Sequence, residues 1–190
     1  HLDLLLNPQV KQTFIKRTKI IQSIRSFLDK HHFLEVETPV LQPIYGGASA
    51  RPFKTHHNAL NQTLYMRIAD ELYLKRLIIG GMDRVYEIGK DFRNEGMDRN
   101  HNPEFTMLEF YWAYADYEDC MNLVEDLIRT IAADINALKI PFNNFGIDLN
   151  RPFKRKKFIE LLSEKLGEDA NDLNKEQLKV ICEKKQICLT

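Results

Sequence analysis

Apolar residues recur at helical spacing in two long stretches of the chain. The first stretch predicts an amphipathic helix over residues 12–31, and the second predicts a helix from Asp116, a capping residue, to a point before Pro141. The repeating positions are Phe14, Thr18, Ile21, Ile24 and Leu28 in the first helix, and Cys120, Val124, Leu127, Ile131, Ile135 and Leu138 in the second. We interpret both stripes as faces that pack into a core.

Three β-prone runs lie between these helices, namely Leu34–Leu41, Arg51–Thr55 and Thr63–Ile68. Pro39 lacks a backbone N–H, so it places an edge, a bulge or a strand end within the first run. Gly47, which follows another glycine, predicts a tight turn or a close approach of the backbone to another group.

A short helix and a long hairpin are predicted next. The helix runs from Asp70, as its N-terminal cap, to Ile79, where two glycines follow. Val85–Glu95 and Glu104–Tyr114 have the composition of strands, and the polar segment Gly96–Pro103 separates them. These segments together predict an antiparallel hairpin with a long polar tip.

Side chains alternate between the two faces of a strand, so the hairpin assembles a polar floor from its two strands. The floor positions are Glu87, Arg93 and Glu95 on the first strand, and Phe105, Glu109 and Tyr111 on the second. This set supplies a guanidinium for phosphate, an aromatic plate and a carboxylate, and the loop adds His101 and Asn102. A carboxylate in an apolar strand costs several kcal/mol unless it meets a cation. An alternative for Glu87 is a pair with a surface Lys or Arg.

The face of the second strand opposite to this floor carries Phe110, Trp112 and Tyr114, which we expect to pack against helices. Beyond Pro141, the composition predicts a short hairpin and then charged helices over residues 157–166 and 175–185. A first domain is therefore predicted over residues 1–153 and the start of a helical insertion over 154–190. The basic run Lys154–Lys157 either contacts RNA or is a solvated face.

Composition indicates an ordinary soluble domain, with 190 residues, 44% hydrophobic and 28% charged. The 27 basic and 27 acidic residues cancel, so any surface for nucleic acid must be local. Cys120, Cys182 and Cys188 match neither a zinc site nor a redox pair, which favours free thiols in a reducing compartment such as the cytoplasm. Without an apolar run near 18 residues, no membrane segment is expected.

The chain has none of the usual phosphate-binding motifs, such as GxxxxGK[ST] or GxGxxG after a strand. A nucleotide site would therefore be built from side chains on an antiparallel sheet. At these residues the sequence resembles the class II aminoacyl-tRNA synthetases, and within them the lysine-specific enzymes. The segments "FRNEG" and "HNPEFTMLEFYWAYADY" resemble motif 2 of the family, and "FLEVETPVL" resembles motif 1. The segments "GGASARPF" and "ELYLKRLIIGG" resemble those that line the lysine pocket.

The resemblance implies an α+β fold, an antiparallel sheet flanked by helices that forms part of a class II catalytic core, with a homodimer interface at motif 1. It implies activation of lysine by ATP, with Mg²⁺, and transfer to the 3′ end of tRNA(Lys). The implied ATP-binding residues are Arg93, which is also catalytic, Glu95, His101, Asn102 and Phe105. The implied lysine-binding residues are Gly47, Glu71, Glu109 and Tyr111. The resemblance supplies no metal ligand in this chain.

Some features depart from the family pattern. Asp70 stands where many members have Pro, and both residues suit a helix start. The anticodon-binding domain and motif 3, which the resemblance implies before His1 and after Thr190, are not in this sequence, so we expect an inactive central piece of a larger enzyme. Three alternatives remain open, which are a ligase that lysylates a protein, a non-enzymatic RNA-binding paralogue, and an aspartate or asparagine enzyme. The last would need a basic group at Glu109.

Overall fold

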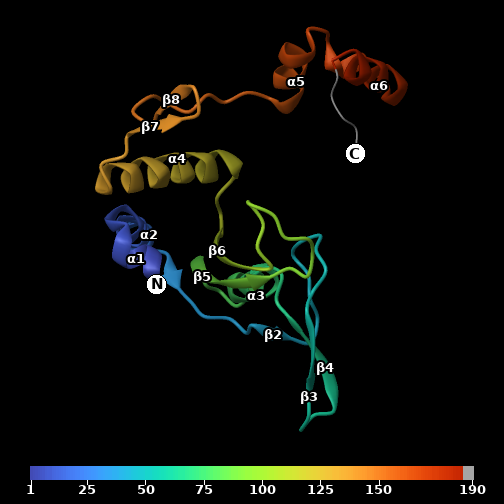
Figure 1. Ribbon diagram of the computed structural model, residues 1–190. Helices are drawn as coiled ribbons and strands as arrows, with labels where there is room; N and C mark the ends of the chain where they lie inside the picture. The colour runs from blue at the N-terminus through green and yellow to red at the C-terminus, as the bar shows by residue number, and fades with distance from the viewer. Residues whose placement is uncertain (186–190) are drawn as a thin grey trace. The chain divides into compact units, whose positions relative to one another are not determined.

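The computed structural model describes residues 1–185 and divides into two compact units, His1–Asn150 and the segment from Arg151 onward. Figure 1 shows the first unit in blue to orange and the second in red. Cys188 lies outside the described residues, whereas Cys120 and Cys182 are free cysteines, as expected. No helix in the described part of the chain is long and apolar enough to cross a membrane. The division into a synthetase core and an insertion stays a prediction.

The first unit begins with helix α1 (Leu2–Leu6), which is followed by the long helix α2 (Pro8–Lys30). Helix α2 starts four residues before the predicted helix, with Asn7 at its N-cap. Pro8 fits this start because the first helical turn has backbone N–H groups without intrahelical partners. The helical spacing of apolar residues does not extend to this turn, so the predicted start of the helix was too late.

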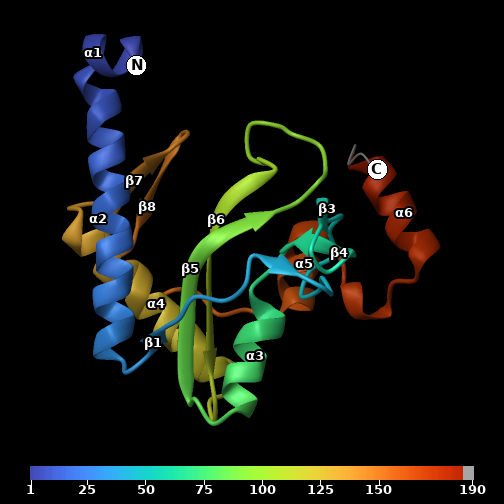
Figure 2. The ribbon, with the colours of Figure 1, turned by 90° about the horizontal axis from the view of Figure 1, so that it is seen from below.

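A central sheet of three strands follows, with the order β1 (Leu34–Glu35), β5 (Arg84–Phe92) and β6 (Glu104–Trp112). Strands β5 and β6 form the predicted antiparallel hairpin, in which Glu87 lies directly opposite Glu109 in the strand register. Figure 2 shows the two strands as one twisted ribbon with the long polar loop at its end. The fold class is confirmed, although β1 pairs with β5 in parallel.

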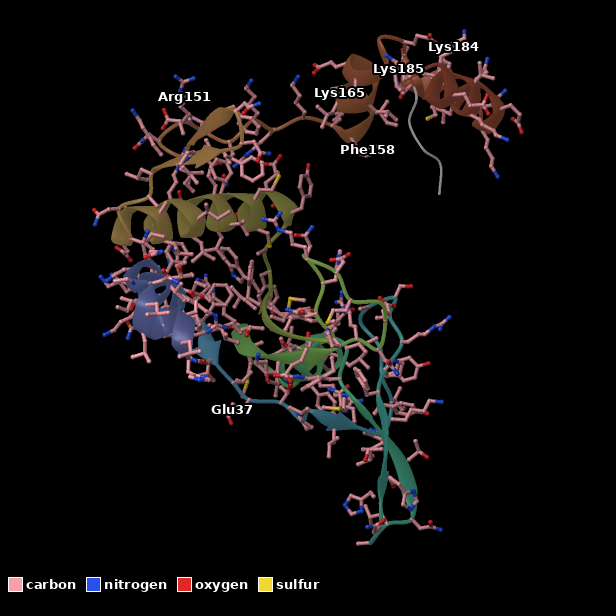
Figure 3. All side chains as sticks on the ribbon, viewed as in Figure 1. Glu37, Arg151, Phe158, Lys165, Lys184 and Lys185 are labelled. Carbon is pink, nitrogen blue, oxygen red and sulfur yellow. The ribbon has the colours of Figure 1, made fainter. Side chains whose placement is uncertain are left out.

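The β-prone run Leu34–Leu41 is interrupted at Pro39, as expected, and its two ends lie in different sheets, which was not predicted. The run forms β1 and a separate strand β2 (Leu41–Gln42), which lies in a second sheet with β4 (Gln62–Met66) and β3 (Lys54–His57). Pro39 stands between β1 and β2, so the expected strand end is confirmed. The side chain of Glu37, also between them, points away from the sheet (Figure 3).

One face of the β5–β6 ribbon forms the hydrophobic core with α2 and with α4 (Tyr117–Asp134). The most buried members of this core are Phe27, Leu28, Phe33, Tyr86, Leu123 and Leu127, with Phe110 and Trp112 packed against them. Asp116 forms the predicted cap, since its carboxylate accepts from two backbone N–H groups. Helix α4 ends at Asp134, earlier than the apolar spacing indicated.

The expected packing of Phe110 and Trp112 against helices is confirmed, but that of Tyr114 is wrong. Tyr114 lies two residues past β6, has a backbone φ of 62°, and is 99% exposed. A residue in this left-handed conformation belongs to a turn, and the alternation of a strand no longer decides where its side chain points. The core-facing side of the ribbon therefore ends at Trp112.

Helix α3 (Glu71–Ile79) contacts β5 and β6 and begins directly after Asp70. Asp70 is the N-cap residue by position, but its side chain makes no capping hydrogen bond. Its carboxylate lies instead 2.9 Å from Arg67 Nη1. The predicted helix is confirmed, whereas the predicted capping role of the Asp70 side chain is wrong.

The rest of the chain forms the short elements that its composition predicts. A hairpin of β7 (Lys139–Phe142) and β8 (Phe145–Asp148) ends the first unit. The second unit contains α5 (Phe158–Leu166), a 3-10 turn η1 (Ala170–Asp172) and α6 (Lys175–Lys184). Leu166, Ala170 and Ile181 form its small core, while Lys165 and Lys184, labelled in Figure 3, are exposed. Lys156 of the basic run pairs with Glu164.

Candidate active site

Arg67 lies on the polar face of the β5–β6 ribbon and is buried, with 1% of its surface exposed. Its Nη1 lies 2.5 Å from Glu87 Oε1 and 2.9 Å from Asp70 Oδ1, and its Nε lies 3.2 Å from Asp91 Oδ1. Glu87 also accepts from the hydroxyl of Thr38 at 2.6 Å. The alternative of a surface partner for Glu87 is therefore wrong, because its partner is a buried guanidinium.

Gly89 leaves the space that the Arg67 guanidinium occupies. A Cβ atom at residue 89 would lie 1.9 Å from Arg67 Nη2 and 3.2 Å from Glu87 Oε1. Any side chain on Gly89 would therefore push Arg67 out of contact with the carboxylates that surround it. Glycine loses more conformational entropy in a strand than other residues do. It is nevertheless required here, because the backbone approaches the guanidinium closely.

Replacing Gly89 by Ala is expected to lower the free energy of unfolding by about 1–3 kcal/mol, the usual cost of overpacking a filled interior. Gly146→Ala is the matched control, because a Cβ atom at residue 146 meets nothing within 4 Å. Denaturant unfolding of both variants beside the unsubstituted protein checks this. Equal stabilities for Gly89→Ala and Gly146→Ala would contradict the tight packing of Arg67.

A group that we call the acid pocket brings together the four residues that were expected to bind lysine, Gly47, Glu71, Glu109 and Tyr111. Gly47 has a φ of 85°, and a Cβ atom on it would lie 2.7 Å from the Cβ of Glu71. The Tyr111 hydroxyl donates to Glu109 Oε2 at 3.3 Å, and the backbone N–H of Asp70 donates to Glu109 Oε1 at 3.2 Å. Burial, followed by the charges of Glu109 and Glu71, raises the pKa of Tyr111, so its hydroxyl stays protonated.

Carboxyl groups outnumber cations in this region. Within residues 1–185, no Lys or Arg pairs with Glu109, and Arg67 is the buried cation facing Glu87, Asp70 and Asp91. Glu71 pairs with the exposed Lys75, an interaction of small energy. The acid pocket thus has an unbalanced negative charge, which favours a positively charged ligand.

The pKa values of the buried carboxyls reflect this imbalance. Burial, and then the charge of Asp91, raises the pKa of Asp70 to about 8. Burial also raises the pKa of Asp91 to about 6, although the nearby Arg67 opposes the shift. Each carboxyl therefore keeps a proton at a pH where an exposed Asp has lost it.

Stability should consequently fall as the pH rises. Because the folded-state pKa of Asp70 lies above the unfolded value of 3.8, the contribution of this proton is present at low pH and is lost as the pH passes 8. We expect the thermal midpoint to fall between pH 6.5 and 8.5 by less in Asp70→Asn than in the unsubstituted protein, because the amide does not titrate. Identical pH dependences in the two proteins would contradict the shift.

A cavity that we call the loop pocket has a volume of about 500 Å³ and lies at the tip of the hairpin. It is lined by the five residues that were expected to bind ATP, namely Arg93, Glu95, His101, Asn102 and Phe105. Arg93 and Glu95 come just after β5 and not within it, since the strand ends at Phe92. The guanidinium carbon of Arg93 lies 5.0 Å from the centre of the Phe105 ring, so a cation and an aromatic plate stand together.

Asp98 orders the loop around this pocket. Its carboxylate accepts from the backbone N–H groups of Asn100 and His101 and lies 2.8 Å from His101 Nδ1. These bonds, the one to the His101 side chain first, lower the pKa of Asp98. With Nδ1 directed at Asp98, the other ring nitrogen of His101 is left for a ligand.

Sequence reasoning missed Arg67, Asp91 and Asp98 as parts of the site. A signal for Arg67 was present, because it stands between Met66 and Ile68 in a β-prone run, where a charge requires a partner. No comparable signal marks Asp91, since its burial depends on how β5 pairs with β6.

The residues described include one acidic group with the spacing of a metal site, formed by Asp70, Asp91 and Glu109, whose oxygen atoms lie within 4.8 Å of one another. Nitrogen atoms of Arg67 already lie 2.9 Å and 3.2 Å from the two aspartates. A guanidinium at this distance repels a divalent cation, and none of the three carboxyls lines the loop pocket. The group therefore does not fit the Mg²⁺ that the resemblance to the synthetases implies.

A cavity lined by a guanidinium and an aromatic ring at the tip of an antiparallel hairpin, with a group of carboxyls on the same strands, is the arrangement of a class II synthetase core. The chain belongs to the family described as tRNA synthetases class II (D, K and N), whose sequence model matches residues 1–189.

Relatives in three bacteria carry the name lysine–tRNA ligase. The protein of Mycoplasma mobile is 53% identical over 98% of this chain and 38% of its own length. The protein of Roseiflexus sp. is 58% identical over 91% of this chain and 36% of its own length. The protein of Carboxydothermus hydrogenoformans is 54% identical over 89% of this chain and 35% of its own length. The chain thus spans little more than a third of the length of these relatives.

Proposed function

We propose that the chain is part of the catalytic domain of an ATP-dependent lysine–tRNA ligase. The observation that carries this proposal is the acid pocket, in which Glu109 has no cationic partner among the described residues, beside a loop pocket suited to a nucleotide. The names of the relatives support the same substrate. An aspartate enzyme is disfavoured because the pocket has the wrong charge for a carboxylate side chain, and an asparagine enzyme because a neutral amide would leave Glu109 without a cation.

The proposed reaction has two steps. The lysine carboxylate attacks the α-phosphorus of ATP, a mixed anhydride bond forms, and the bond to the bridging oxygen of pyrophosphate breaks. A ribose hydroxyl of the terminal adenosine of tRNA(Lys) then attacks the lysyl carbonyl carbon and loses its proton, the bond from that carbon to the phosphate oxygen breaks, and AMP leaves. The first nucleophile is already ionised near neutral pH, so the first step needs positioning and charge stabilisation but no general base.

Arg93 is the proposed catalytic residue, because its planar fork can contact the α-phosphate and the lysine carboxylate together. Phe105 stacks on adenine, Glu95 contacts adenine or the tRNA end, and His101 and Asn102 reach the phosphates or the base from the loop. Their common location around one cavity supports these roles.

The acid pocket receives lysine in this proposal. Glu109 pairs with the ε-ammonium group, and Tyr111 hydrogen-bonds beside it. Glu71 and the backbone at Gly47 hold the α-amino end. The hydrogen bond between Tyr111 and Glu109 supports this arrangement, because it orients one oxygen of the Glu109 carboxylate.

Further partners belong to the same proposal. Motif 1, residues 33–41, forms a homodimer interface, which is supported by the exposure of Leu34 and Leu41 at 55% and 47%. Mg²⁺ accompanies ATP, and we assign it no ligand and no step in this chain. We further propose that the protein is cytoplasmic and that Lys154–Lys157 form a solvated face.

The proposal is tested by pyrophosphate exchange on the full-length protein that contains this chain, with each of the twenty amino acids in turn. Exchange with lysine alone is expected, and exchange that prefers aspartate or asparagine would refute the assignment. Charging of tRNA(Lys) in a second assay separates a tRNA ligase from one that lysylates a protein. Residues 1–190 alone should show no exchange, because they span so little of the relatives' length.

A further inference from the structure

Three carboxyl groups converge behind the acid pocket from three different elements. Asp70 comes from the residue before α3, Asp91 from β5 and Glu109 from β6, and their oxygen atoms lie within 4.8 Å of one another. We call this set the carboxyl cluster. Asp70 and Asp91 are wholly buried, with 0% exposure, whereas Glu109 is half-buried and faces the pocket.

The buried members of the cluster have an incomplete set of partners. None of the four carboxylate oxygens of Asp70 and Asp91 accepts an aligned hydrogen bond from the described residues. Arg67 lies within ion-pair distance of both, but its shortest contact, 2.5 Å, is to Glu87. The single guanidinium of Arg67 thus lies within ion-pair distance of three carboxyls, and Glu109 adds a fourth carboxyl to the group.

Six further groups face the cluster from the elements packed around it. The two arginines are Arg67, before α3, and Arg93, just past β5. The others are Glu71 on α3, Glu87 on β5 and Tyr111 on β6, and the sixth is Lys75, which forms an ion pair with Glu71. Tyr111 stays neutral, and Glu71 is paired with Lys75, so the cluster depends on Arg67 and Arg93 for positive charge. Carboxyls this close, without enough counter-charge, cannot all be ionised, and they titrate as a coupled group.

We propose that Asp70 and Asp91 determine the specificity of the acid pocket for a cationic substrate, by holding a proton beside Glu109 that leaves when an alkylammonium group binds to Glu109. This inference rests on the proposed function and extends it to two residues outside the lysine-binding set. The ammonium group brings one positive charge to Glu109, and the displaced proton passes to solvent, so the charge of the pocket is conserved. Asp70 and Asp91 act through Glu109 and are positioning residues.

The proton exchange makes lysine binding depend on pH in a defined way. While the cluster holds its proton, lysine affinity rises with pH, at most about tenfold for each pH unit when a whole proton is released. Because burial and the charge of Asp91 raise the pKa of Asp70 to about 8, the rise should flatten above that pH. A pocket that releases no proton when lysine binds would give no such rise.

Calorimetric titration of lysine into the full-length protein at pH 7, in phosphate and in Tris, tests the proposal. These buffers differ in their heats of ionisation, so proton release appears as a difference between the observed heats. We expect release in the unsubstituted protein and in Asp126→Asn, an exposed control on α4, and clearly less release in Asp70→Asn. Asp91→Asn provides a second variant if Asp70→Asn fails to fold.

The outcomes of this titration distinguish a failure of the proton exchange from a failure of the proposed function. Lysine binding with equal heats in both buffers would overturn the proton exchange and leave the proposed function intact. Undiminished release in the folded Asp70→Asn and Asp91→Asn variants would also overturn it. No lysine binding by the unsubstituted protein would instead contradict the proposed function itself.

Discussion

Replacing Arg93 by Lys is expected to lower the rate of adenylate formation by about 100- to 1,000-fold, the usual cost of losing a donor to developing charge. Lysine keeps the positive charge but lacks the planar fork that can contact the α-phosphate and the lysine carboxylate together. Because the contact strengthens as charge builds on the α-phosphate, turnover should fall much more than ATP affinity.

Steady-state pyrophosphate exchange on the full-length protein measures this effect. Arg99→Lys is the matched control, since Arg99 is exposed in the same loop and is not among the residues that line the loop pocket. We expect the control to keep its turnover. An unchanged turnover in Arg93→Lys would show that the bidentate contact is not used in the reaction.

Glu109→Gln is expected to weaken lysine binding by roughly 3–5 kcal/mol, because it leaves an ammonium group facing a neutral amide in a desolvated pocket. The substitution keeps the size of the side chain and removes its charge. ATP affinity should change little, since Glu109 is not among the residues that line the loop pocket.

Calorimetric titration of lysine, and separately of ATP, into the full-length variant provides the measurement. Glu104→Gln is a suitable control, because Glu104 lies at the exposed start of the same strand and pairs with the exposed Lys90 at 3.3 Å. Equal lysine affinities in Glu109→Gln and Glu104→Gln would show that the ammonium group is assigned to the wrong residue.

Local signals in the sequence predicted most of the elements correctly. The β5–β6 hairpin, helix α3, the Asp116 cap of α4 and the helices after residue 157 are all confirmed. Each depends on neighbouring residues, through strand alternation, capping chemistry or helical spacing. The five residues expected around the nucleotide also share one cavity, because four of them lie in the loop between β5 and β6 and Phe105 lies at the start of β6.

The errors arise where contacts distant in sequence decide the structure. Leu34–Leu41 changes sheet at Pro39, because β1 pairs with β5 and β2 with β4. The Asp70 side chain prefers a buried guanidinium to the helix end that its position suggested. The contacts of Arg67 with the buried carboxyls depend on how β5 and β6 pack against the segment before α3. No local sequence pattern predicts that packing.

The most direct test of the account is a crystal structure of the full-length protein with a non-hydrolysable analogue of lysyl-adenylate. We predict that the ε-ammonium group contacts Glu109, the group replacing the α-phosphate contacts Arg93, and the adenine ring stacks on Phe105. An analogue whose ammonium group lies away from Glu109, or whose adenine lies outside the loop pocket, would contradict the proposed site.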